Sequence, residues 1–119
     1  MLDFRSLKGW EKAHALTLII YRLVQEFPAP DAETLGKKIQ QTAIAVPTQL
    51  VEGCGKDAEA DQRACFREAL VSANSLEYLL LLAFDLGYLQ EDSYQFTRMD
   101  LAEVRNTLEQ LAQPQVENP

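Results

Sequence analysis

The sequence lacks most of the residues from which catalytic and metal sites are built. It has one histidine, His14, and two cysteines, Cys54 and Cys65, in 119 residues. The cysteines are eleven positions apart, which fits neither a CxxC redox motif nor a zinc site. Di-iron bundles use ExxH pairs, and the chain contains none. We therefore expect no metal and no cofactor, and we interpret the cysteines as reduced thiols packed as small apolar groups.

Signals for several other protein classes are also missing. The sequence shows no glycine-rich phosphate loop, no GxSxG elbow and no alternating strand pattern. Its most apolar run, residues 78–84, is far shorter than the roughly 20 residues of a membrane span. No apolar stretch follows the first charges, so we expect no signal peptide. These absences predict a cytoplasmic protein with no membrane contact and no evident small-molecule substrate.

Positive charge is scarce. The 11 Lys and Arg residues face 18 Asp and Glu residues, which gives a net charge of −7. An acidic chain argues against non-specific duplex binding, because that needs many simultaneous phosphate contacts. Small basic patches are usually just solvated faces, although a patch repeated around a ring could hold RNA. The candidate nucleic-acid contacts are Arg5, Lys8, Lys12, Lys37 and Lys38.

What the sequence does contain is helical periodicity. Apolar residues recur at three- and four-residue spacing in four segments, which predicts four amphipathic helices. The expected helices span roughly residues 7–26, 32–54, 60–86 and 91–112. Ser6 and Asp31 are the expected N-caps of the first two helices. Gly53 and Gly55 are expected to stop the second helix, and Gly87 lies where the third should end.

These helices predict an all-α fold with a single domain over residues 4–112. Short connections between consecutive helices favour an up-down-up-down four-helix bundle. The last segment, residues 113–119, has two prolines and little to bury, so we expect a frayed tail.

The third helix carries more apolar surface than one subunit should need. At about 100° per residue, seven consecutive apolar residues cover every side of a helix. The run must be covered by its own fold, by another subunit, or by both. We predict a ring or other closed oligomer; the alternative is that the other three helices surround the run completely. The expected interface residues are Tyr78, Leu81, Leu82, Phe84 and Phe96.

Four polar residues are candidates for a structural or a catalytic role. Glu77, inside the apolar run, could be a buried acid or base, but we favour a structural contact because no nucleophile or metal partner is near. Ser72 could bond to its own helix or to a neighbour. Glu52 opposes the helix dipole and should have a cationic or donor partner such as Lys56. His14 is interpreted as a surface or satisfied histidine.

Several segments taken together resemble the bacterial family of 23S rRNA intervening-sequence proteins, to which the accessory proteins of diversity-generating retroelements look related. The matching pieces are F-x-x-L-x-x-W-x-x-A at Phe4, Leu7, Trp10 and Ala13; Phe27–Pro28; A-x-x-V-P at Ala43, Val46 and Pro47; Glu52–Gly53; A-L-x-S-x-x-x-L-E at Ala69, Leu70, Ser72, Leu76 and Glu77; and D-L-G-Y-L over residues 85–89. They keep the order and spacing of the family over about residues 4–112.

The resemblance implies a left-handed up-down bundle that assembles into a homopentamer and has no known enzymatic activity. It also implies that some relatives bind RNA and a reverse transcriptase, so RNA or a nucleoprotein is the expected partner. This chain departs from the pattern at Gln40 and Gln41, where many relatives have arginines. Gln49 replaces an asparagine, and Ser75 replaces a glutamate. These departures weaken the expectation of direct RNA binding.

Three hypotheses follow. The first is a non-catalytic homo-oligomeric scaffold or adaptor that binds RNA or a nucleoprotein. The second is a protein-interaction scaffold with no nucleic-acid role. The third is an enzyme that uses Glu52, Glu77 or His14, which requires at least two of these side chains to converge in one pocket.

Overall fold

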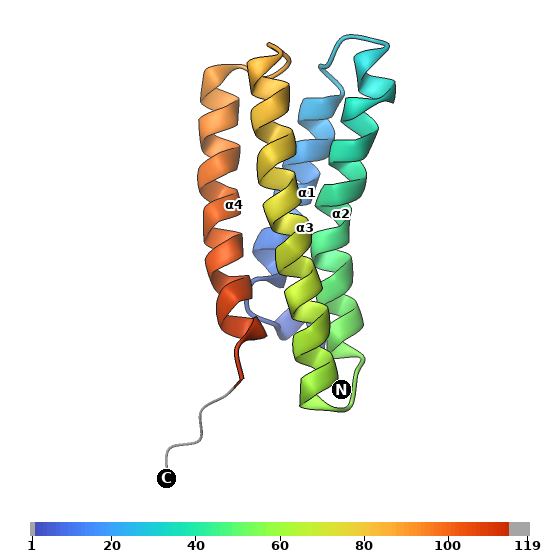
Figure 1. Ribbon diagram of the computed structural model, residues 1–119, viewed down its shortest axis with the longest axis vertical. Coiled ribbons are helices and arrows are strands. Elements are labelled where there is room, and N and C mark those ends of the chain that lie inside the picture. Colours follow the sequence, from blue (N-terminus) through green and yellow to red (C-terminus); the bar gives the residue numbers. More distant parts are fainter. Residues whose placement is uncertain (1, 115–119) are drawn as a thin grey trace.

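The computed structural model describes residues 2–114, which form four α-helices and no strand (Figure 1). The helices are α1 (Trp10–Val24), α2 (Leu35–Cys54), α3 (Glu59–Asp85) and α4 (Glu91–Ala112). Two short 3-10 turns, Phe4–Ser6 and Asp31–Glu33, precede α1 and α2. The all-α prediction is therefore confirmed. Most of the predicted frayed tail, residues 115–119, lies outside the described part of the chain.

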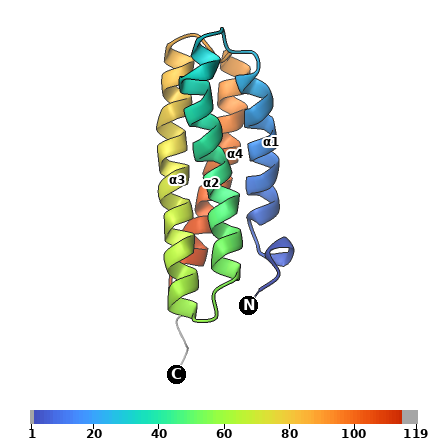
Figure 2. The ribbon, with the colours of Figure 1, turned by 90° about the vertical axis from the view of Figure 1, so that its right-hand side faces the viewer.

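The four helices lie side by side along one long axis (Figures 1 and 2). Helix α1 packs against α2 and α4, and α3 also packs against α2 and α4. The pairs α1/α3 and α2/α4 therefore occupy opposite corners. The connections after α1 and after α3 lie together at the upper end in Figure 1, while the α2–α3 connection lies at the other end. We call the upper end the two-loop end.

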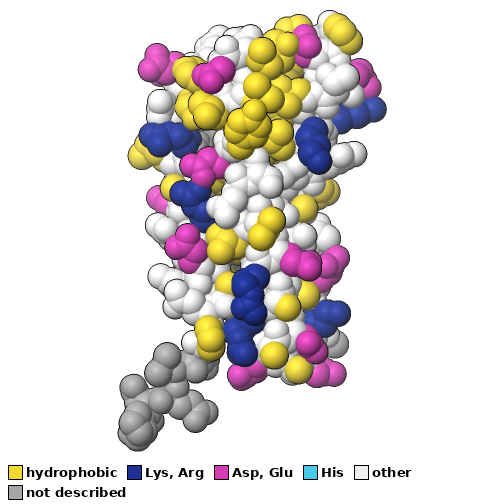
Figure 3. All heavy atoms as spheres, viewed as in Figure 1, with side chains coloured by type: hydrophobic (Ala, Val, Ile, Leu, Met, Phe, Trp, Pro, Cys, Tyr) yellow, Lys and Arg dark blue, Asp and Glu magenta, His cyan; other side chains and the backbone are white. Residues whose placement is uncertain are grey.

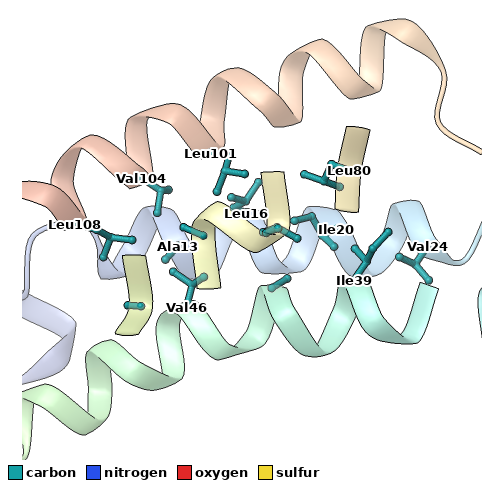
Figure 4. Packing of buried hydrophobic residues seen from close by; sticks show 14 of the residues in the cluster. Ala13, Leu16, Ile20, Val24, Ile39, Val46, Leu80, Leu101, Val104 and Leu108 are labelled. Carbon is teal, nitrogen blue, oxygen red and sulfur yellow. The ribbon is translucent and has the colours of Figure 1, made fainter. Parts of the chain in front are cut away.

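The core forms where the apolar stripes of all four helices meet. Figure 4 shows side chains such as Leu16, Ile39, Leu80 and Leu101 pointing into the shared interior from α1, α2, α3 and α4 respectively. The largest fully buried side chains include Ile20, Leu50, Leu76 and Leu108. Each such side chain contributes about 1.5–3 kcal/mol by leaving water. The periodicity read from the sequence is thus the periodicity of the core.

Helix α1 begins three residues later than predicted, and Ser6 is not its N-cap. The Ser6 hydroxyl donates to the carbonyl of Asp3 at 2.8 Å and so belongs to the preceding 3-10 turn. Gly9 occupies the N-cap position instead, with φ +93°. A Cβ at this position would lie 2.6 Å from Cγ2 of Thr107 on α4. Backbone conformation and space both require glycine here.

Helix α2 also begins three residues late, and the prediction of Asp31 as its N-cap is wrong. Asp31 opens a 3-10 turn, and its carbonyl accepts from the Thr34 hydroxyl at 3.3 Å. Gly53 does not stop α2 either, because it lies inside the helix and is buried. A Cβ on Gly53 would meet Cε1 of Phe66 at 2.6 Å, so this glycine allows α2 and α3 to approach closely. Gly55 follows the helix as its C-cap.

The predicted end of α3 at Gly87 is confirmed. Gly87 has φ +84°, and its N–H donates to the carbonyl of Phe84 at 2.9 Å. The N–H of Tyr88 donates to the carbonyl of Ala83 at 2.9 Å, which completes a Schellman motif. The hydroxyl of Tyr88 bonds to Asp31, which raises the pKa of Tyr88. This contact ties the two connections at the two-loop end to each other.

Candidate subunit interface

Helix α3 leaves part of its apolar surface exposed to solvent, including two residues of its apolar run. Val71, Tyr78 and Leu81 are 64%, 60% and 40% exposed. Tyr78 and Leu81 follow Val71 by seven and ten residues, so at 3.6 residues per turn all three share the outward side of α3. Figure 3 shows hydrophobic side chains gathered near the two-loop end on this side of the molecule. The alternative that one subunit surrounds the whole run is therefore wrong. We call Val71, Tyr78 and Leu81 the α3 outer face.

The other predicted interface residues do not all join this face. Leu82 is half-buried. Phe84 turns toward α4, where its ring stacks on Tyr94 with centroids 4.4 Å apart. Phe96 lies on α4 and is 58% exposed. The five residues thus divide between the outer side of α3, the α3–α4 contact and a separate surface on α4.

A groove runs between α2 and α3 beside Tyr78. Its volume is about 530 Å³, and its only charged lining residue is Lys38. The lining residues are Lys38, Gln41, Thr42, Ala45, Val71, Ser72, Ser75, Tyr78 and Leu79. We call it the α2–α3 groove. It includes two of the positions at which the sequence departs from the pattern it resembles, Gln41 and Ser75.

A second exposed apolar surface lies on α4. Phe96 and Met99 are 58% and 65% exposed. With Asp92 they occupy positions i, i+4 and i+7, which places all three on one stripe of the helix. We call this stripe the α4 ridge. Phe96 and Asp92 also border a hollow against Ile19 and Leu23 of α1, in which Asp92 is the only charged lining residue.

Ser72 makes the interhelical contact that its position suggested. Its hydroxyl donates to Oε1 of Gln49 on α2 at 3.0 Å, and the pair is partly buried. Gln49, another position that departs from the resembled pattern, thus joins α2 to α3 through its side-chain oxygen.

The three residues of the catalytic hypothesis lie apart. Glu77 forms an ion pair with Arg105 on α4, and their side chains are 44% and 28% exposed. His14 is exposed and stacks on Trp10, with ring centroids 5.1 Å apart. Glu52 is exposed at the end of α2, and no ion pair to residues 2–114 involves it. Glu77 borders a small cavity with Arg98 and Met99 that neither His14 nor Glu52 lines.

Two of the four lysine candidates are neutralised within the chain. Lys12 pairs with Glu103 and lies 3.8 Å from Asp100, both on α4. The hydrogen bond to Glu103 raises the pKa of Lys12. Lys37 forms an ion pair with Glu33 at 3.0 Å. These contacts reduce the charge that either lysine offers to a phosphate.

The remaining basic candidates do not form one cluster. Arg5 precedes α1, lies over the ring of Phe4 at 4.6 Å and is 4.0 Å from Asp3. Lys8 also precedes α1, whereas Lys38 lies in the first turn of α2 at the two-loop end. All three side chains are exposed. Arg5 and Lys8 thus lie at one end of the bundle and Lys38 at the other.

The described residues contain no group of three or more His, Cys, Asp or Glu side chains that could hold a metal ion. Within the same residues, no helix has both the length and the hydrophobicity needed to cross a membrane.

The sequence matches the family model of the 23S rRNA-intervening sequence protein over residues 5–110. The chain belongs to this family. A solved structure with a similar fold is a protein of unknown function from the S23 ribosomal protein family of Bacteroides thetaiotaomicron. Its TM-score is 0.82 at 20% sequence identity, and the match covers 89% of this chain and 99% of that one. No curated protein is significantly similar in sequence.

Family membership confirms the resemblance read from the motifs. The matched residues include all four helices except the last two residues of α4. The α3 outer face and the α4 ridge therefore lie within the family region. The structural similarity at 20% identity extends to the fold and no further.

Proposed function

We propose that the protein is a non-catalytic scaffold whose subunits, each a left-handed up-down-up-down bundle, assemble into a ring of identical copies in the cytoplasm. The resemblance described above suggests five copies. The observation that carries the proposal is the exposure of Val71, Tyr78 and Leu81 beside a core that is already complete. Exposed apolar patches of this kind are typical of protein contacts.

Light scattering coupled to gel filtration tests the assembly. At micromolar concentration the purified chain should elute with a mass several times 13.4 kDa. Replacing Tyr78 and Leu81 with serine should lower that mass, because both side chains are exposed and their loss leaves the core intact. A wild-type mass of one subunit would overturn the proposal.

The scaffold is proposed to bind a macromolecular partner, and RNA is one candidate. Repetition of Arg5 and Lys8 around a ring would multiply a modest positive surface. The affinity for a structured RNA should then fall steeply as salt is raised, and Lys8→Glu should weaken binding. Lys12 is unsuitable for this test, because its reversal would also break its contact with α4.

A protein partner without RNA is the second candidate. It is favoured by the ion pairs that occupy Lys12 and Lys37, and by the net charge of −7. Absence of RNA binding at low salt by an assembled ring would select this candidate. Salt-dependent binding that Lys8→Glu weakens would select the first.

A further inference from the structure

We propose that the subunits join head to tail, with the α4 ridge of one copy seated in the α2–α3 groove of the next. This inference rests on the proposed assembly and specifies the two surfaces that form it. The occupant of the groove is thus a second copy of this chain.

The two surfaces complement each other in shape. Phe96 and Met99 project from α4 and are more than half exposed, whereas the α2–α3 groove is a depression of about 530 Å³. Val71 and Tyr78 line that depression and are themselves 64% and 60% exposed. Joining the ridge to the groove would remove Tyr78, Phe96 and Met99 from water together, which neither surface achieves alone.

The charges are complementary as well. Lys38 is the only charged residue that lines the α2–α3 groove. Asp92 is the acidic member of the α4 ridge and the only charged residue bordering the hollow beside Phe96. Each charge lies near the two-loop end of its surface, with the apolar residues deeper along the helix. An ion pair between Lys38 and Asp92 would therefore fix the direction in which the ridge enters the groove.

The two surfaces also lie at the same level of the bundle. With a rise of 1.5 Å per residue, Phe96 is about 8 Å from the start of α4, and Thr42 is about 10 Å from the start of α2. Tyr78 is about 10 Å from the end of α3. All three of these helix ends lie at the two-loop end. Contact therefore needs little translation along the bundle axis, which is one condition for a closed ring; the other is that the rotation from copy to copy returns to the starting copy.

Helices α2 and α4 occupy opposite corners of the bundle, so ridge and groove do not compete for the same partner. Each copy can place its α4 ridge in the groove of one neighbour and receive the ridge of another neighbour in its own groove. The contact is heterologous, which is the type that a ring with more than two subunits requires.

The test uses one variant of each surface and a mixture of the two. Tyr78→Arg blocks the groove, and Phe96→Asp removes the ridge. Both side chains are exposed, so each variant should keep the helical circular-dichroism spectrum of the wild type. Each variant alone should fail to assemble, so that light scattering gives the mass of one subunit. Mixed in equal amounts, they should form a heterodimer and nothing larger, because one intact ridge and one intact groove remain.

Matched controls are Ile44→Arg on α2 and Leu18→Asp on α1, which are both 46% exposed and belong to neither surface. Both should assemble like the wild type. Lys38→Asp and Asp92→Lys should each weaken assembly, and the two changes in one chain should restore it.

The inference is overturned if the wild type assembles but the mixture remains monomeric, or if Phe96→Asp assembles normally. In both cases the ring itself survives with another interface. A monomeric wild type would instead defeat the proposed assembly and the inference with it.

Discussion

Replacing Gly9 with alanine should destabilise the protein through two separable effects. The first is backbone strain, since alanine in the left-handed region costs about 1–2 kcal/mol. The second is overlap with α4, because the new Cβ would lie 2.6 Å from Cγ2 of Thr107. Overpacking of this kind costs about 1–3 kcal/mol. The expected loss in the free energy of unfolding is therefore about 2–5 kcal/mol.

Gly87→Ala is the matched control. Gly87 also has a positive φ, +84°, but no atom lies within 4 Å of the position that a Cβ would occupy there. Its alanine variant should therefore show only the strain of about 1–2 kcal/mol. The difference between the two variants isolates the cost of the overlap.

A double-mutant cycle identifies the atom responsible. Thr107→Ser removes Cγ2 and leaves the Cβ of residue 107, which is 3.3 Å from the new methyl group. In the Thr107→Ser background, the destabilisation by Gly9→Ala should fall almost to that of Gly87→Ala. Urea unfolding followed by circular dichroism supplies the free energies, at one fixed subunit concentration because assembly adds stability by mass action. The reasoning is refuted if Gly9→Ala and Gly87→Ala lower the free energy of unfolding equally, or if Thr107→Ser does not reduce the effect of Gly9→Ala.

Three further predictions concern side-chain contacts. Lys12→Glu should lower the urea midpoint, and adding Glu103→Lys should restore it. The bond to Glu103 raises the pKa of Lys12 above 10.5, so the pair stabilises the fold below that pH. This stabilisation is lost as pH rises through the raised pKa, which urea midpoints measured at increasing pH would show. Ser72→Ala should cost about 1 kcal/mol in urea unfolding, because its bond across to α2 is lost. In the native protein a thiol reagent should modify Cys65 before Cys54, because Cys54 is buried and burial raises its pKa. Mass mapping of the labelled peptides gives the order, and faster labelling of Cys54 would contradict the prediction.

Element positions follow from the sequence wherever local signals determine them. Helix α4 spans the predicted residues 91–112, because its stripe of inward residues is regular from Tyr94 to Leu108. Helix α3 differs by one residue at each end, since Gly87 supplies an unambiguous stop. The predicted starts of α1 and α2 are each three residues too early. Both errors arise from a 3-10 turn, which carries the same polar residues as an N-cap but closes its bonds locally.

The partners of polar side chains are less predictable, because they depend on which helices become neighbours. The Glu77–Arg105 pair and the contact of Lys12 with Glu103 need the registers of α3 against α4 and α1 against α4, which no local pattern contains. The stack of Trp10 on His14 is different. These residues are four apart on one helix, so their spacing alone places the rings together.

The position of Trp10, the chain's single tryptophan, has a practical consequence. It begins α1, whereas α1 finishes at the two-loop end, so the indole lies far from the surfaces proposed to join subunits. Its fluorescence therefore acts as a built-in optical reporter of unfolding that dissociation leaves unchanged. Dilution series read by emission and by scattered light would separate the loss of structure from the loss of neighbours without any added label.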